Sequence, residues 1–121
     1  MAATLSKMER LSGRTAIGVL MDKGRWSQSP HLRCCCLYDN GLEISRLMVS
    51  VPKKHFKRAV RRNLLKRRMR EVFRQNKELP GPGGCDILFV YNSPDILPYS
   101  DICEEMTRLM RRIGEQRASA Q

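Results

Sequence analysis

Half of the residues in one stretch of this chain carry groups that bind phosphate. Eleven of the 22 residues at positions 53–74 are lysine or arginine, and Glu71 is the one acid among them. The chain of 121 residues has 23 basic and 12 acidic residues, a net charge of +11, and outside the stretch 12 basic and 11 acidic residues nearly cancel. Arginine, whose planar guanidinium suits two-point contact with phosphate oxygens, outnumbers lysine there by seven to four. Charge concentrated in this way predicts a surface that binds a polyanion.

The same stretch has the composition of a helix, without internal Gly or Pro. Its apolar residues fall into two stripes that lie on different sides of a helix. The first stripe contains Phe56, Val60 and Leu64, and the second contains Leu65, Met69, Val72 and Phe73. One straight helix cannot bury both stripes against a single surface. We therefore expect a helix at residues 59–74 that buries the second stripe, preceded by a basic loop at residues 53–58.

The rest of the chain predicts the elements that must position this helix. A short helix is expected at residues 14–21, with Ser12 as its N-cap and Gly24 just past its end. Strands at residues 32–38 and 42–51 are expected to form a hairpin through the Asn-Gly turn at 40–41. The Pro- and Gly-rich run at 80–84 precedes a buried strand at 86–91. A last helix, capped by Ser100, is expected to end near Gly114.

These elements predict a small α+β domain with a central sheet and a basic helix. The expected order is α-β-β-(β)-α-β-α, in which the bracketed strand is a further short strand that forms if the segment at residues 45–51 bends. Residues 1–121 are expected to form a single domain, with a core at about 5–114 and a frayed tail at 115–121.

Composition excludes several classes of protein. Hydrophobic residues make up 41% of the chain, too many for a disordered basic tail. No apolar run approaches the roughly 20 residues of a membrane helix, and the first residues lack the apolar stretch of a signal peptide, so we expect a cytoplasmic protein. The five cysteines include no C-x-x-C pair, which argues against a zinc site. Cys34, Cys35 and Cys36 are expected to be reduced thiols that serve as small apolar residues of the core.

No group of residues suggests that the chain catalyses a reaction by itself. His31 and His55 are its two histidines, and the basic residues around His55 disfavour the protonated imidazole. Asp86 and Asp95 flank a strand without forming a carboxylate cluster. We expect no catalytic residue and no metal ligand in this chain.

Structured RNA fits the basic stretch better than the alternatives. A solvated helix usually mixes signs, whereas Arg58, Arg62, Lys66 and Arg70 place like charges four residues apart, at a cost of roughly 0.2–0.5 kcal/mol per pair. A membrane-binding helix would need the apolar stripe that we assign to the core. A DNA-binding helix with Asn63 reading adenine would be followed by a zipper or by a second helix, and here a strand follows. Recognition of RNA through shape and backbone suits a helix-plus-sheet domain.

Residues 50–74, SVPKKHFKRAVRRNLLKRRMREVFR, resemble the signature of the bacterial ribonuclease P protein family. Arg62-Asn63, Lys66-Arg67 and Arg70-Glu71 occupy the places of its Arg-Asn-Arg and Lys-Arg-x-x-Arg-Glu motifs. The runs ERLSGRTAIGVLMDKGR and GCDILFVYNSPDILPYSDICEEMTRLMRRI resemble its first helix and its last strand and helix. The resemblance covers about residues 5–114.

The resemblance implies an RNA-binding subunit of an endoribonuclease that removes the 5′ leader from precursor tRNA. It implies that the RNA subunit is the partner and holds catalytic Mg²⁺ ions, and that the chain alone is inactive. It further implies that the leader binds in a cleft between the sheet and the N-terminal helix, and that the fold contains a left-handed βαβ crossover. The alternative is a general module for structured RNA, such as a ribosomal protein.

The chain departs from the family pattern at four places. Leu64 stands where the third motif arginine would be, so that contact is absent or comes from Arg61 or Arg68. Residues 55–57 contain an apparent one-residue insertion, and Pro52 replaces the usual serine. Ile17 and Met21 stand where the family has aromatic residues.

Three sets of candidate residues follow. The candidates for RNA binding are Lys53, Lys54, Lys57, Arg58, Arg61, Arg62, Asn63, Lys66, Arg67 and Arg70. The candidates for the leader cleft are Ile17, Met21, Cys35 and Leu37, each of which fits the core at least as well. Trp26 could stack on a base or pack over the sheet edge.

Overall fold

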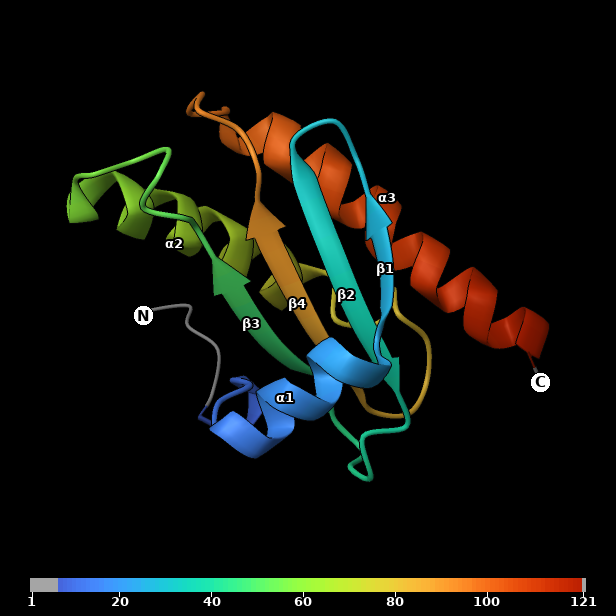
Figure 1. Cartoon of the computed structure of the whole chain (residues 1–121). Coiled ribbons are helices and arrows are strands. Elements are labelled where there is room, and N and C mark those ends of the chain that lie inside the picture. Colours follow the sequence, from blue (N-terminus) through green and yellow to red (C-terminus); the bar gives the residue numbers. More distant parts are fainter. Residues whose placement is uncertain (1–6, 121) are drawn as a thin grey trace.

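A computed structural model describes residues 7–120 and confirms a small α+β domain (Figure 1). Residues 1–6 and residue 121 of the expected domain lie outside the described residues. The elements in chain order are the 3₁₀ turn η1 (Lys7–Glu9), α1 (Arg14–Lys23), β1 (Arg25–Gln28), β2 (Leu32–Tyr38), β3 (Arg46–Ser50), α2 (Ala59–Gln75), β4 (Cys85–Tyr91) and α3 (Tyr99–Ala120). Within residues 7–120, no helix is both long and apolar enough to span a membrane.

The four strands form one mixed sheet in the order β1-β2-β4-β3. Strand β2 is antiparallel to β1 and β4, and β3 is parallel to β4. The expected hairpin between residues 32–38 and 42–51 is therefore wrong, because β4 lies between these two segments. The turn residues do adopt left-handed backbone, with φ of 56° at Asp39 and 83° at Gly41. However, the loop bonds to the start of β4, through Asn40 N–H to Gly84 O and Gly84 N–H to Leu42 O.

Strand β1 was not expected from the sequence. Its four residues, Arg25–Gln28, contain one apolar side chain and show no alternating pattern. It forms the edge of the sheet, where one strand partner is enough and an apolar face is not required. The bracketed strand of the prediction corresponds to β3, which is shorter than the expected strand at 42–51.

The connection from β3 to β4 is a left-handed crossover, as the family resemblance implies. Figure 1 shows β3 and β4 pointing upward, with β4 to the right of β3 and α1 in front of the sheet. After β3 the chain passes behind the sheet through α2 and returns as β4. A right-handed crossover, which is the general rule, would carry the connecting helix in front.

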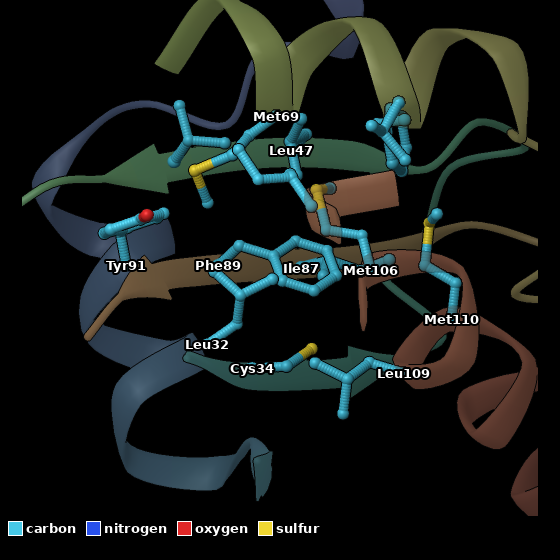
Figure 2. Packing of buried hydrophobic residues seen from close by; sticks show 14 of the residues in the cluster. Leu32, Cys34, Leu47, Met69, Ile87, Phe89, Tyr91, Met106, Leu109 and Met110 are labelled. Carbon is cyan, nitrogen blue, oxygen red and sulfur yellow. The ribbon is translucent and has the colours of Figure 1, made fainter. Parts of the chain in front are cut away.

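The main core lies between the sheet and the two long helices. Buried side chains of β2 and β4 face α2 and α3, among them Cys34, Ile87 and Phe89. Figure 2 shows Met69 of α2 and Met106 of α3 gathered around these strands. All five cysteines are free, and Cys34, Cys35 and Cys36 are buried, as expected. Burial raises the pKa of the Cys34 thiol to about 12, which fits an apolar role.

Helix α2 confirms the two-stripe interpretation. The second stripe, Leu65, Met69, Val72 and Phe73, is buried. Of the first stripe, Phe56 lies in the preceding loop and contacts the Tyr91 ring at 5.9 Å between centroids, while Val60 is 79% exposed. The loop thus turns Phe56 into the core before the helix begins.

Helix α3 is longer than expected, because residues 115–120 continue it instead of fraying. A Cβ at Gly114 would lie 2.5 Å from the Leu79 carbonyl oxygen, so glycine there permits close packing and does not end the helix. Beyond it, the Arg117 guanidinium is buried and donates to the carbonyl oxygens of Pro80 and Gly83, at 3.1 and 3.3 Å. Arg117 therefore holds the loop at 80–84 against the end of α3.

Two expected N-caps are also corrected. Helix α1 is preceded by Gly13 without a side-chain cap, and Ser12 makes no capping bond. Ser100 lies inside the first turn of α3, where the Pro98 carbonyl oxygen accepts from Asp101 N–H and Ile102 N–H.

A buried carboxylate fixes the turn between β1 and β2 to α3. Glu105 of α3 accepts hydrogen bonds from the Ser29 hydroxyl and from the backbone N–H of His31 at 2.9 Å, and its second oxygen lies 2.6 Å from His31 Nδ1. Burial would raise the pKa of Glu105, but these hydrogen bonds outweigh it and hold the pKa below its usual range. The β1–β2 hairpin is thus anchored at its tip.

Met69→Ala should lower the free energy of unfolding by about 2–5 kcal/mol, because the Met69 side chain is fully buried between α2 and the sheet. Urea denaturation measures this change. Val60→Ala on the same helix is the control and should change stability by less than about 0.5 kcal/mol, since Val60 is exposed. Equal losses in the two variants would contradict the assigned core face.

Candidate nucleic-acid interface

The candidate RNA-binding residues lie along one continuous part of the chain, from the basic loop at 53–58 onto α2. Eight of the ten side chains are exposed: Lys53, Lys54, Lys57, Arg58, Arg61, Asn63, Arg67 and Arg70. Arg62 and Lys66 are half-buried. Asn63, Arg67 and Arg70 follow one another at spacings of four and three, and so form a line on the side opposite the buried stripe. The helix therefore presents amide and guanidinium groups to solvent along its length.

Few of these charges are neutralised within the protein. Glu71, the one acid of the stretch, accepts from Arg74 Nε at 3.0 Å and Nη2 at 2.6 Å, and from Gln75 at 2.9 Å. The hydrogen bond from Arg74 lowers the pKa of Glu71, which stays ionised. Arg61, Lys66 and Arg67 form no ion pair among residues 7–120. The acid thus offsets Arg74 alone, and the candidate residues are not neutralised by ion pairs within the described part of the chain.

Arg62 has an internal role in addition to its charge. Its Nη1 donates to the carbonyl oxygens of Phe56 and Lys57, at 2.7 and 2.9 Å. Helix α2 has no side-chain N-cap, and Arg58 stands at that position with extended backbone. Arg62 thereby ties the basic loop to the first turns of α2 and positions the lysines of the loop.

Leu64 stands at the place of the third motif arginine, and the two arginines weighed as substitutes differ in exposure. Arg68 donates from Nη1 to the Leu97 carbonyl oxygen at 2.6 Å, which connects α2 to the segment before α3. Arg61 is exposed. Of the two candidates that the sequence offered, Arg61 is the one whose guanidinium makes no hydrogen bond within residues 7–120.

Sequence reasoning missed a basic residue beside α2. The pKa of Arg70 is lowered, first by partial burial of its guanidinium and second by the like charge of Arg10, which lies nearby. Arg10 precedes α1 and forms an isolated parallel bridge with Leu47 of β3. Their repulsion would be relieved by an anion between them. No local pattern marks Arg10, because the chain fold alone brings it to α2.

Helix α1 covers part of the other sheet face, which we call the α1 face. Leu20 of α1 packs there against Cys35 and Leu88, with Ile17 and Leu37 half-buried at the margin. Cys35 is fully buried, and its Sγ donates to the Leu20 carbonyl oxygen at 3.4 Å. Of the four leader-cleft candidates, Met21 alone is exposed, by 48%. Cys35 therefore has a packing role beneath α1, and only the margin of the cluster is accessible on this face.

The strand register identifies residues on the α1 face that the sequence did not suggest. The row beyond Cys35 contains Gln28, Arg33, Val90 and Ser50, which are paired across the four strands. Arg33 is exposed, while Val90 and Ser50 are half-buried. We call this row the open row. Alternation along β2 predicts that Arg33 and Cys35 share one face of the sheet. Which residues of β4 and β3 lie beside Arg33 depends on the strand order, which the sequence does not reveal.

The acids that were weighed as catalytic groups have structural contacts. Asp86 is buried and accepts from Arg46 Nε and Nη2 at 2.8 and 2.7 Å and from Asn40 at 2.9 Å. Asp95 donates its backbone N–H to the Ser93 hydroxyl at 3.1 Å. Residues 7–120 contain no cluster of three or more His, Cys, Asp or Glu side chains that could hold a metal ion. His55 Nε2 is buried without a hydrogen-bond partner in the part of the chain described.

Comparison with known proteins gives one consistent family. A family model described as Ribonuclease P matches residues 5–114. The ribonuclease P protein component of Syntrophus aciditrophicus is 30% identical over 109 residues, which cover 90% of each chain. That of Thermotoga maritima is 34% identical over 109 residues, 90% of this chain and 85% of the relative. A solved structure of the RNase P protein from Thermotoga maritima superposes with a TM-score of 0.76 at 29% identity, and covers 87% of this chain and 97% of that one.

Arg62→Ala should lower the free energy of unfolding by about 1–2 kcal/mol, because two hydrogen bonds from a charged group to the basic loop are lost. Chemical denaturation measures the change. The matched control is Arg61→Ala, which removes an exposed guanidinium from the same turn and should change stability by less than about 0.5 kcal/mol. An unchanged midpoint for Arg62→Ala would show that the loop does not depend on this side chain.

Proposed function

Because the chain belongs to the bacterial ribonuclease P protein family, we propose that it binds the RNA subunit of this endoribonuclease and the 5′ leader of precursor tRNA. The chain is the protein component of the ribonuclease P holoenzyme, in which its basic surface and its α1 face would contact RNA. The observation that carries the proposal is the unneutralised basic surface of α2 and the loop before it, which lies on the family motif.

The physical case for RNA binding rests on charge and shape. Six to ten contacts between basic side chains and phosphates would give tight binding that weakens steeply with salt. The basic loop and α2 supply that many side chains along one continuous part of the chain. A helix backed by a sheet presents them at fixed spacing, which suits the regular phosphates of folded RNA.

The leader is proposed to lie on the α1 face, next to α1. Cys35 lies too deep to touch it, so the contacts fall to Met21, to the half-buried Ile17 and Leu37, and to the open row. The leader would then run toward the basic loop that follows β3.

The chemical step is proposed to belong to the RNA subunit. Mg²⁺ ions held by that RNA would activate water and stabilise the leaving oxygen. The part of this chain that the structure describes has no group of side chains that would hold these ions, so its contribution is to bind and orient RNA.

Reconstitution tests the proposal directly. The purified chain alone should leave precursor tRNA intact, and addition of the cognate RNA subunit with Mg²⁺ at low salt should yield tRNA with a mature 5′ end. Gel analysis of the products measures both. Cleavage by the chain alone would contradict the assignment of catalysis to RNA. Tight binding to many structured RNAs without any gain in cleavage would instead favour a general RNA-binding module.

Lys66→Ala should weaken binding to the RNA subunit and reduce the slope of log K against log salt by about 1, because one phosphate contact is lost. Filter binding at several salt concentrations measures the slope. Arg112→Ala is the control, since it removes one exposed positive charge from α3, outside the basic loop and α2. An equal change in both variants would mean that net charge, and not this surface, sets the affinity.

A further inference from the structure

An aromatic–cation stack stands at the edge of the α1 face. Trp26 of β1 pairs with Cys35 of β2, so both side chains point to the α1 face. Arg33, two residues before Cys35, points to the same face, and its guanidinium carbon lies 4.6 Å from the centre of the Trp26 ring. Arg33 is exposed, and Trp26 is 40% exposed. The pair is therefore open to solvent. An indole has a large apolar surface, so its exposure to water costs free energy.

Packing does not account for the position of Trp26. Helix α1 covers the neighbouring Cys35 and Leu88 with Leu20, but Trp26 is not part of that buried cluster. Arg33 forms no ion pair within residues 7–120, so its charge is not needed inside the protein. A half-exposed indole beside an unpaired guanidinium is the combination on which nucleobases stack, with the cation also close to the phosphate.

The stack is held in place before any ligand arrives. Trp26 and Arg33 lie on the two strands of the β1–β2 hairpin, whose tip Glu105 binds through Ser29 and His31. Four residue pairs fix the register of the two strands. The strand pairing therefore holds the ring and the guanidinium in place before binding, which lowers the conformational entropy lost when a base binds.

The open row leads from this stack to the basic loop. Arg33 is paired with Val90, and Val90 with Ser50, across β2, β4 and β3. Ser50 ends β3, and the lysines of the basic loop follow within the next few residues. A single strand of RNA across this row would have a base at Trp26, apolar contact at Val90 and cations at both ends. Figure 1 shows α1 at the lower end of the strands, whereas the register places this row toward the start of β2 and the ends of β4 and β3.

We propose that Trp26 and Arg33 form a stacking site for one unpaired base of the 5′ leader of precursor tRNA. This inference rests on the proposed function and names one contact that orients the leader on the α1 face. Stacking accepts any base through its π-face, so the site contributes affinity for leaders in general and not for one sequence.

Trp26 is the one tryptophan of the chain, so its fluorescence reports this site alone. The holoenzyme is mixed rapidly with precursor tRNA, and tryptophan emission is followed before cleavage. Leaders long enough to reach the site should quench the emission, and mature tRNA should not. Quenching by the RNA subunit alone, without further change on addition of the leader, would overturn the proposal in favour of a contact with that RNA.

Variants separate stacking from charge. Trp26→Ala should raise the Kd of the holoenzyme for precursor tRNA about 5- to 150-fold and leave the Kd for mature tRNA unchanged. Trp26→Phe, which keeps a ring, should recover most of the affinity. Arg33→Gln should weaken binding of the precursor, whereas Arg25→Gln is the matched control. Arg25 lies over the Tyr38 ring on the other side of the same hairpin, at 5.6 Å, and its loss should change neither Kd.

The outcomes also distinguish the two levels of the proposal. A holoenzyme that assembles and cleaves normally, but in which Trp26 emission does not respond to the leader, would refute the stacking site and leave the proposed function standing. Failure to assemble with the RNA subunit would refute the proposed function itself. Equal losses from Trp26→Ala for precursor and mature tRNA would also overturn the stacking site, because they would place Trp26 away from the leader.

Discussion

The burial of β4 on both of its faces is the constraint from which the rest of the fold follows. Six of its seven residues are buried, with α1 over one face and α2 and α3 over the other. Such a strand must be paired on both edges, because its backbone groups cannot reach water. Strand β2 satisfies one edge and β3 the other, in parallel. A parallel neighbour requires a crossover, and α2 is that crossover. The basic helix is thus attached to the most buried strand at one end and to the sheet edge at the other.

The sequence predicts well those features that depend on neighbours along the chain. The start of α2 at Ala59 and its buried stripe were confirmed, because the two apolar stripes cannot share one surface. The pairing of β3 was not predicted correctly. An Asn-Gly pair favours a hairpin locally, but the buried β4 competes for the same edge of β2 and gains more from it. Arg117 and Arg62 could not have been assigned from sequence, because their partners are backbone carbonyls that only the fold brings near.

In the candidate site too, some features follow from neighbours along the chain and others only from the fold. Charge and motif point to α2 and its loop, and the structure leaves eight of those ten side chains exposed. The α1 face could be inferred only in outline. Of its candidate residues, Cys35 is buried beneath α1, in agreement with the alternative assignment to the core. The proximity of Arg33 and Val90 could not be predicted from the sequence, since it arises from the antiparallel register of β2 and β4. Residue type thus indicates what a surface binds, whereas the sheet order determines which residues form it.

The alternation along β2 has a consequence for how variation in this chain would be read. Cys34 and Cys36 point into the main core, whereas Arg33 points to the open row. In a saturation scan, adjacent codons of one strand would then fall into separate phenotypic classes: some whose variants are lost through degradation, and others whose variants accumulate normally but process RNA poorly. Abundance and activity profiles would separate at Arg33, whereas Cys35, which α1 covers on the same face, would follow the core positions. Measured together, the two profiles would test the proposed RNA-facing surface without any structure of the complex.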